Sequence, residues 1–276
     1  MPQNIKQILQ IIIDNFAKAN INTAKIEAEI ILSSVLNLKR FELYLNLDKP
    51  ILKNELETIL TIISRRKKRE PLQYILGETE FYDCKIKVNK YVLIPRPETE
   101  FLIEKIILEN PKIKQILDIG TGSGAIAIAL AKFLPNCQID AIDISINALE
   151  IAKNNAVKNN VNITFSHSNL FENANKRYNL IVSNPPYISK NNFIDLQPEI
   201  TKFEPITALV AGENGLYFYR KILENAKKYL TDDGKIYFEI GHNQAKIIKN
   251  IATLNGFKNI EICRDLNNFD RIMVIA

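Results

Sequence analysis

The chain has 276 residues, of which 46% are hydrophobic and 24% are charged, with a net charge of +5. This length suits two domains, and the composition is typical of a protein with a packed core. No apolar run is long enough to cross a membrane, and the N-terminus lacks a signal-peptide pattern, so we expect a cytoplasmic protein. Three isolated cysteines and two histidines make a zinc site or a disulfide framework improbable.

The first seventy residues have the periodicity of helices. Leu56, Ile59, Leu60 and Ile63 follow the i, i+3, i+4, i+7 spacing of one apolar helix face. Residues 4–19 and 23–36 carry similar stripes, the second with a plausible N-cap at Asn22 or Thr23. Because strands do not alternate with these helices, the pattern predicts a small helical domain over residues 1–70.

The densest basic run, SRRKKRE at residues 64–70, lies at the end of this domain. One interpretation is a patch that contacts phosphates. The other is the solvated end of a helix, where cations complement the helix dipole. We favour the second, because no aromatic residues are interleaved to stack on bases.

Residues 71–95 read as a linker with a probable hairpin, since residues 79–89 alternate imperfectly between polar and apolar side chains. A helix is then predicted to begin at Pro97, which suits the first helical position. Glu98 and Glu100 would either complement the positive end of this helix or buttress a site nearby.

From residue 115 onward, strand and helix patterns alternate. Alternation of this kind predicts an α/β fold with a doubly wound, mostly parallel sheet and helices on both faces. The last two strands are separated only by a short loop and are expected to pair antiparallel. We assign residues 96–276 to this domain. The strands are predicted within residues 115–120, 138–145, 162–168, 178–184, 235–241, 257–264 and 270–276.

A glycine loop joins the first strand to its helix. Gly120, Gly122 and Gly124 let the backbone turn sharply and let a ligand approach closely. Asp143 ends the next strand, where a carboxylate suits the hydroxyls of a ribose. The loop alone predicts a nucleoside site, but dinucleotide enzymes use similar loops, and a tight turn without a ligand stays possible.

The fourth strand ends in Asn184, Pro185, Pro186 and Tyr187. The two prolines restrict the backbone and push Asn184 into an extended conformation. In the usual doubly wound order this strand lies beside the glycine loop, so Asn184 points toward the ligand. Its side-chain carbonyl and the Pro185 carbonyl can accept both hydrogens of a planar NH2 group, and Tyr187 offers an aromatic surface. We therefore expect transfer of a group onto a nitrogen.

These motifs resemble the S-adenosylmethionine-dependent amino-methyltransferases, which have a seven-stranded methyltransferase sheet. The stretches REPLQYILGETEFY, IPRPETE, VSNPPYI and FEIGHNQ narrow the resemblance to the release factor glutamine methyltransferase (HemK) family, from about residue 65 to the end. That resemblance implies an enzyme of translation termination that methylates the amide nitrogen of the glutamine in the Gly-Gly-Gln motif of peptide chain release factors. S-adenosyl-L-methionine would be the methyl donor, and the helical domain would recognise the substrate.

The resemblance also implies roles for single residues. Asn169 stands where the family often has Asp, yet its carbonyl still accepts a hydrogen bond. The stretches AGENG and RDLNNFDR also depart from the usual glycine positions of the family. The implied cofactor residues are Gly120, Thr121, Gly122, Ser123, Gly124, Asp143, Asn169, Leu170 and Asn184, and those for the substrate are Asn184, Pro185, Pro186 and Tyr187, with Asn184, Pro185 and Tyr187 catalytic.

Three alternatives remain open from the sequence. The enzyme could methylate a glutamine of a ribosomal protein, or an adenine or guanine amino group in nucleic acid, which requires a basic face and a base-flipping pocket. A third possibility is an RNA-binding module with a vestigial cofactor site. We expect a monomer without a metal, a membrane partner or a nucleic-acid substrate. The long connection at residues 189–214 is expected to enclose the substrate, although it could be a surface excursion. His242 is expected to be a turn or packing residue.

Overall fold

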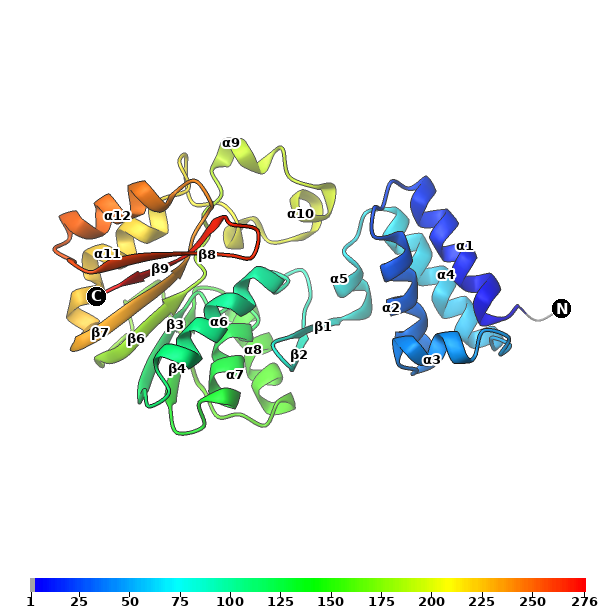
Figure 1. The fold of residues 1–276 in the computed structure, drawn as a ribbon, viewed down its shortest axis with the longest axis horizontal. Helices are drawn as coiled ribbons and strands as arrows, with labels where there is room; N and C mark the ends of the chain where they lie inside the picture. Colours follow the sequence, from blue (N-terminus) through cyan, green and yellow to red (C-terminus); the bar gives the residue numbers. More distant parts are fainter. Residues whose placement is uncertain (1–2) are drawn as a thin grey trace. The chain divides into compact units, whose positions relative to one another are not determined.

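The structure is a computed structural model that describes residues 3–276, and the chain forms two compact units (Figure 1). The first unit holds the chain up to Gly77 together with Pro198–Phe203. The second holds Glu78–Gln197 and Glu204–Ala276. The helical unit thus extends beyond the predicted boundary at residue 70 and takes in a short segment from the long connection after the fourth strand. Within the described residues, no helix is both long and apolar enough to cross a bilayer.

Isoleucine-rich faces hold the first unit together. Its first helix begins with a capping box, in which Asn4 Oδ1 accepts from the Gln7 N–H at 3.0 Å and Gln7 Oε1 accepts from the Asn4 N–H at 3.1 Å. Ile8, Ile12 and Phe16 on that helix are buried against the other helices. The helices are α1 (Ile5–Lys18), α2 (Ala24–Leu36), α3 (Arg40–Leu45), α4 (Lys53–Lys67), α5 (Leu72–Leu76) and α10 (Pro198–Phe203).

The helix predicted from the spacing of Leu56, Ile59, Leu60 and Ile63 is α4, but its buried face is rotated from the predicted one. Ile59 and Ile63 are buried, whereas Leu60 is 50% exposed. Arg66 completes the buried face with Ile62. An arginine on this face requires carboxylate partners, because a buried charge is stable only when it is paired.

The interpretation of the basic run as a solvated helix end is wrong for Arg66. Its side chain is only 6% exposed, and its guanidinium binds Glu27 on α2 at 2.7 Å and Glu199 on α10 at 2.9 Å. Arg69 binds the second oxygen of Glu199 at 2.7 Å. The basic run therefore fastens α10 to the helical unit. The sequence could not show this, because Glu199 lies 133 positions from Arg66.

Replacing Arg66 with alanine should therefore lower the free energy of unfolding by roughly 3–5 kcal/mol, because Glu27 and Glu199 would be left half-buried without their shared cation. Arg65→Ala is the matched control. Arg65 is 44% exposed and pairs with Glu70, so its loss should cost less than about 1 kcal/mol. Urea unfolding of the three proteins measures the difference. Equal losses in the two variants would contradict the account of the network.

A hairpin and a helix open the second unit. The strands β1 (Glu78–Phe81) and β2 (Cys84–Lys87) pair antiparallel. The fully buried Asn155 fixes β2 to the glycine loop, because its side-chain amide donates to the carbonyls of Lys87 at 3.0 Å and Ser123 at 2.9 Å. Helix α6 (Pro97–Glu109) begins at Pro97 as predicted.

The sheet of the second unit has the predicted doubly wound architecture. In the part of the chain that the structure describes, seven strands lie in the order β5-β4-β3-β6-β7-β9-β8, and β9 runs antiparallel to both of its neighbours. Figure 1 shows α6, α7 and α8 on one side of the sheet and α11 and α12 on the other. The strands are β3 (Gln115–Ile119), β4 (Gln138–Asp143), β5 (Thr164–His167), β6 (Tyr178–Ser183), β7 (Leu230–Glu239), β8 (Ile260–Arg264) and β9 (Asp270–Ile275), and the helices are α7 (Ala125–Phe133), α8 (Ile146–Lys158), α11 (Tyr217–Tyr229) and α12 (Ala245–Leu254).

The connection after β6 folds back onto the segment that directly follows this strand. It contains α9 (Lys190–Phe193), α10 and the short 3₁₀ helix η1 (Ile206–Ala208). The Ile188 N–H donates to the Leu209 carbonyl at 3.0 Å, and the Ala211 N–H donates to the Ile188 carbonyl at 2.9 Å. These bonds hold residues 207–210 beside the Asn-Pro-Pro-Tyr segment.

Candidate functional site

A pocket of about 310 Å³ lies in the second unit where β3 and β6 end side by side. Asp118 of β3 is in register with Val182 of β6, so Gly120 and Asn184 follow the two strand ends at the same level. The Ser183 hydroxyl ties the two ends together by donating to the Ile119 carbonyl at 2.6 Å. The volume is at the lower end of the range for sites that hold small organic molecules.

The glycine loop forms one wall of the pocket. Gly120 and Gly122 have φ angles of +73° and +55°, in the left-handed region. A Cβ atom on either would meet no atom within 4 Å, so both face open space, whereas one on Gly124 would lie 3.1 Å from the Ala152 Cβ. Gly120 and Gly122 therefore form an open cradle for a ligand, and Gly124 is required for the packing of α7 against α8.

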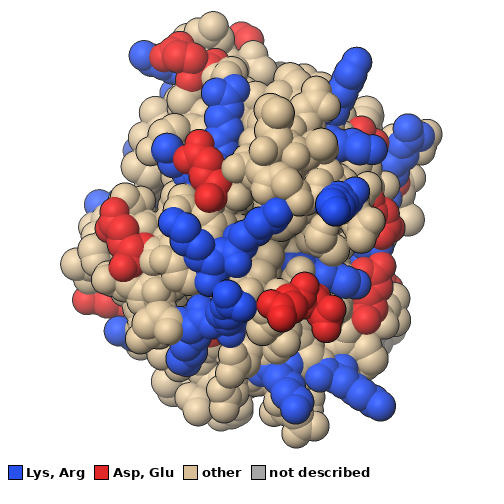
Figure 2. All heavy atoms as spheres, turned by 90° about the vertical axis from the view of Figure 1, so that its left-hand side faces the viewer, with Lys and Arg blue, Asp and Glu red and all other residues tan. Residues whose placement is uncertain are grey.

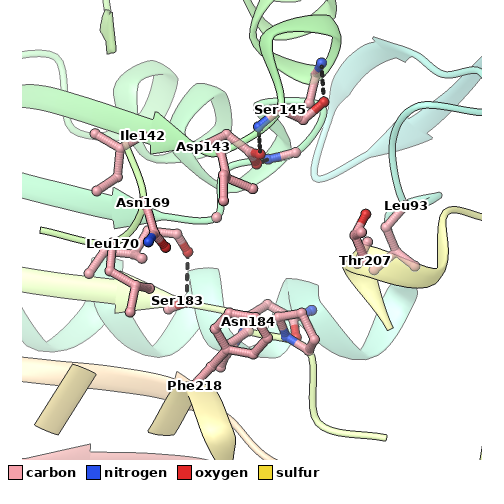
Figure 3. Close-up of a pocket in the computed structure, with 18 of the residues that line it drawn as sticks. Leu93, Ile142, Asp143, Ser145, Asn169, Leu170, Ser183, Asn184, Thr207 and Phe218 are labelled. Carbon is pink, nitrogen blue, oxygen red and sulfur yellow. Dashed lines mark hydrogen bonds between the residues drawn. The ribbon is translucent and has the colours of Figure 1, made fainter. Parts of the chain in front are cut away.

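Asp143 forms a second wall and also braces the glycine loop. Its Oδ2 accepts from the Gly122 N–H at 2.8 Å, and its Oδ1 accepts from the Ser145 N–H at 2.8 Å (Figure 3). Burial raises the pKa of this carboxyl, although the backbone N–H groups of Ser145 and Gly122 oppose the shift. Each oxygen keeps a free lone pair, so the carboxylate can still accept from a ligand hydroxyl.

Asn169 and Leu170 form the wall on the side of β5, as Figure 3 shows. The Asn169 side-chain nitrogen donates to Glu172 at 3.0 Å, which leaves its oxygen free to accept. Leu170 has a φ of +49°, an uncommon conformation for a residue with a branched side chain, and its carbonyl accepts from the Ser168 hydroxyl at 2.7 Å. This turn holds an acceptor and an apolar side chain at the pocket.

Asn184 and Pro185 line the floor of the pocket. The Asn184 side-chain nitrogen donates to the Thr99 hydroxyl at 3.2 Å, and the Thr99 hydroxyl donates to Glu239 Oε2 at 2.6 Å. Within the described residues, no hydrogen bond occupies Asn184 Oδ1 or the Pro185 carbonyl. The structure therefore leaves two adjacent acceptors free, as expected for a site that holds an NH2 group.

The structure brings eight of the predicted site residues together around the pocket, namely Gly120, Gly122, Asp143, Asn169, Leu170, Asn184, Pro185 and Pro186. It does not place Thr121, Ser123, Gly124 or Tyr187 among the lining residues. The Thr121 hydroxyl donates to Asp118 at 2.7 Å, and Ser123 is buried against Asn155. The Tyr187 hydroxyl points toward Glu239 at 3.4 Å, and its ring packs partly against the core. The direct ligand roles of these four residues stay predictions.

Several lining residues were missed from the sequence. Leu93 and Thr207 face Asn169 across the pocket, and Phe218 lies beside Asn184 (Figure 3). The long connection was expected to enclose the site, but only the structure identifies Thr207, Ala208 and Val210 as the part that does so. Glu98 and Glu100 were considered as buttresses, but the residue between them, Thr99, contacts Asn184, while Glu100 accepts from the Tyr82 N–H at 2.9 Å.

Asp118 gives the site a pH-dependent stability. Burial raises its pKa to about 7, and the nearby Asp143 adds to the shift. Since the carboxyl titrates near pH 4 in an unfolded chain, the native state binds the extra proton between about pH 4 and pH 7. The contribution of Asp118 to the free energy of unfolding therefore falls as the pH rises through this range.

We expect Asp118→Asn to remove this dependence. As the pH rises from about 5 to about 8 without added ligand, the free energy of unfolding of the variant should rise by roughly 2–3 kcal/mol relative to that of the parent protein. Urea unfolding at a series of pH values measures the gain. Asp232→Asn, whose carboxylate is 97% exposed, should give a curve parallel to that of the parent. A parallel curve for Asp118→Asn would contradict the assignment.

Comparison with known proteins shows to which class of enzyme this fold and this pocket belong. Residues 97–201 match the model of the methyltransferase small domain family, and residues 7–77 match that of the PrmC N-terminal domain. A methyltransferase structure from Pyrococcus furiosus superimposes with a TM-score of 0.54 over 81% of this chain and 98% of its own, at 19% identity, which shows a shared fold. The chain is an S-adenosylmethionine-dependent methyltransferase.

Relatives of known activity narrow this class to a family. The chain is 45% identical to the release factor glutamine methyltransferase of Thermodesulfovibrio yellowstonii, over 90% of this chain and 91% of the relative. It is 40% identical to the enzyme of the same name from Geobacter sulfurreducens, over 98% and 95% of the two chains. The chain belongs to the release factor glutamine methyltransferase family.

Proposed function

We propose that this enzyme transfers a methyl group from S-adenosyl-L-methionine to the side-chain amide nitrogen of the glutamine in the Gly-Gly-Gln motif of peptide chain release factors. The observation that carries the proposal is the pair of free acceptors, Asn184 Oδ1 and the Pro185 carbonyl, beside the open glycine cradle. A primary amide presents two N–H groups in one plane, which this pair can accept together.

The residues of the pocket suit S-adenosylmethionine. Gly120 and Gly122 leave open space at the start of α7, where the methionine part of the cofactor would lie. Asp143 would accept from the ribose hydroxyls, and Asn169 and Leu170 would lie along the adenine, with Asn169 Oδ1 accepting from its amino group. When bound, this cofactor supplies an electrophilic methyl group on a positively charged sulfur.

The residues of this chain would contribute to catalysis by aligning the substrate nitrogen with the methyl group. An amide nitrogen is a poor nucleophile because its lone pair is delocalised into the carbonyl. Asn184 and Pro185 would turn the NH2 group so that its lone-pair face meets the methyl group, and fixed positioning can contribute about 7–11 kcal/mol in favourable cases. Among the described residues that line the pocket, only Asp143 and Tyr91 have ionisable side chains, and Asp143 already binds two backbone N–H groups. We therefore propose no general base. None is required, because the amide becomes acidic as it is alkylated and loses its proton readily.

The charges around the pocket favour an amide over a nucleobase. No lysine or arginine lines the pocket in residues 3–276. Figure 2 shows a different face of the molecule, on which basic side chains gather near the middle and acidic side chains lie around them. A nucleic-acid methyltransferase needs cations along the phosphate backbone. This argues against adenine or guanine as the substrate, while a glutamine of a ribosomal protein stays the alternative within the same chemistry.

The partner and the location follow from the proposed substrate. A release factor works in translation, which implies a cytoplasmic enzyme. The monomeric state stays a prediction.

The direct test is mass spectrometry of a purified release factor after incubation with the enzyme and S-adenosylmethionine. We expect one added methyl group on the glutamine of the Gly-Gly-Gln motif, and none when that glutamine is replaced by alanine. Methylation of a ribosomal protein or of RNA, with no change in the release factor, would contradict the proposal.

A further inference from the structure

The Asn184 amide has a hydrogen-bond partner behind it, away from the pocket. Its Nδ2 donates to the Thr99 hydroxyl at 3.2 Å, and that hydroxyl donates to Glu239 Oε2 at 2.6 Å. Thr99 is 4% exposed and Glu239, the last residue of β7, is 2% exposed. Asn184, Thr99 of α6 and Glu239 of β7 thus form one hydrogen-bonded series that ends at the pocket.

We propose that Thr99 and Glu239 are positioning residues that determine which end of the Asn184 amide faces the substrate. The inference rests on the proposed function, in which Asn184 Oδ1 accepts from the substrate NH2 group. It adds two residues that do not line the pocket and to which the sequence assigned no role.

The direction of these two hydrogen bonds follows from the number of hydrogens available. A carboxylate can only accept, and the 2.6 Å contact is typical of a hydroxyl that donates to one. A threonine hydroxyl has a single hydrogen, so once this is given to Glu239, its oxygen can only accept from Asn184. The Asn184 NH2 group must then face Thr99, and Oδ1 must face the pocket. A rotated amide would place two oxygen acceptors against each other.

Glu239 acts on a second residue of the motif as well. The Tyr187 hydroxyl lies 3.4 Å from Glu239 Oε1, so the two carboxylate oxygens receive one hydroxyl from α6 and one from the Asn-Pro-Pro-Tyr segment. The Tyr219 hydroxyl donates to the main-chain carbonyl of the same glutamate at 2.8 Å, which fixes its backbone. These contacts hold the carboxylate in place, so that it can orient the Thr99 hydroxyl.

The test compares two substitutions at one position. Thr99→Val keeps the shape of the side chain and removes the hydroxyl, whereas Thr99→Ser keeps the hydroxyl. For methylation of the release factor, we expect Thr99→Val to lower kcat by roughly tenfold, since one oriented hydrogen bond is lost. KM and the affinity for S-adenosylmethionine should change little. Thr99→Ser should restore most of kcat.

A double-mutant cycle separates positioning from a general loss of structure. If Thr99 acts through Asn184, Thr99→Val should have no further effect on kcat in an Asn184→Ala background. A full tenfold loss in that background, or an unchanged kcat for Thr99→Val alone, would overturn the inference. Failure of the proposed function looks different, because the parent enzyme itself would then leave the release factor unmethylated. Cofactor affinity and thermal unfolding of each variant verify that the pocket is intact.

Discussion

Replacing Asn184 with alanine is expected to lower kcat by roughly a hundredfold, because loss of one acceptor lets the substrate amide rotate away from the aligned geometry. Affinity for S-adenosylmethionine should stay close to that of the parent enzyme, since the glycine loop and Asp143 are untouched. Steady-state methylation of a release factor gives kcat, and calorimetric titration gives the cofactor affinity.

Asn225→Ala is the matched control for this variant. Asn225 lies on α11 outside the pocket, and within residues 3–276 its side chain donates only to the Lys221 carbonyl of its own helix. Turnover in the control should equal that of the parent enzyme. If Asn184→Ala turns over as fast as this control, Asn184 has no part in holding the substrate.

The second large effect is expected at Asp143. Asp143→Ala removes the acceptor for the Gly122 and Ser145 N–H groups as well as the proposed partner of the ribose hydroxyls. Affinity for S-adenosylmethionine should fall by about tenfold to a hundredfold, as expected for lost hydrogen bonds to a charged group. The free energy of unfolding should also fall by about 1–3 kcal/mol, because a part-buried N–H group loses its partner.

Asp143→Asn separates the two functions of this carboxylate. Asparagine keeps one acceptor oxygen, so it can satisfy one backbone N–H while its own NH2 group opposes the other. Its cofactor affinity and stability should both lie between those of the parent enzyme and Asp143→Ala. Parent-like cofactor affinity in Asp143→Ala would show that the carboxylate does not contact the cofactor.

The sheet and the central part of the site were predictable because their signals are local in sequence. Gly120 and Gly122 stand where the backbone takes positive φ values, and the prolines after Asn184 mark the end of β6. The order of β3 and β6 in a doubly wound sheet then brings these two segments together.

The remaining parts of the site depend on contacts between distant residues. Thr99 and Glu239 are 140 positions apart, and neither has a local pattern that indicates a polar contact. Arg66 was interpreted as part of a solvated run, since the carboxylates that neutralise it lie on α2 and α10. The sequence also contains no sign that the Tyr187 hydroxyl would be directed toward Glu239 at the end of β7. Such pairings arise only once the chain has folded.

The central claim is that one pair of carbonyl oxygens, from Asn184 and Pro185, binds the nitrogen that is methylated. The most direct measurement is a crystal structure of the enzyme with S-adenosylhomocysteine and a release-factor fragment that carries the Gly-Gly-Gln motif. The account predicts the glutamine side-chain nitrogen within about 3 Å of both oxygens. A glutamine side chain bound elsewhere, or an Asn184 amide with its nitrogen toward the substrate, would contradict it.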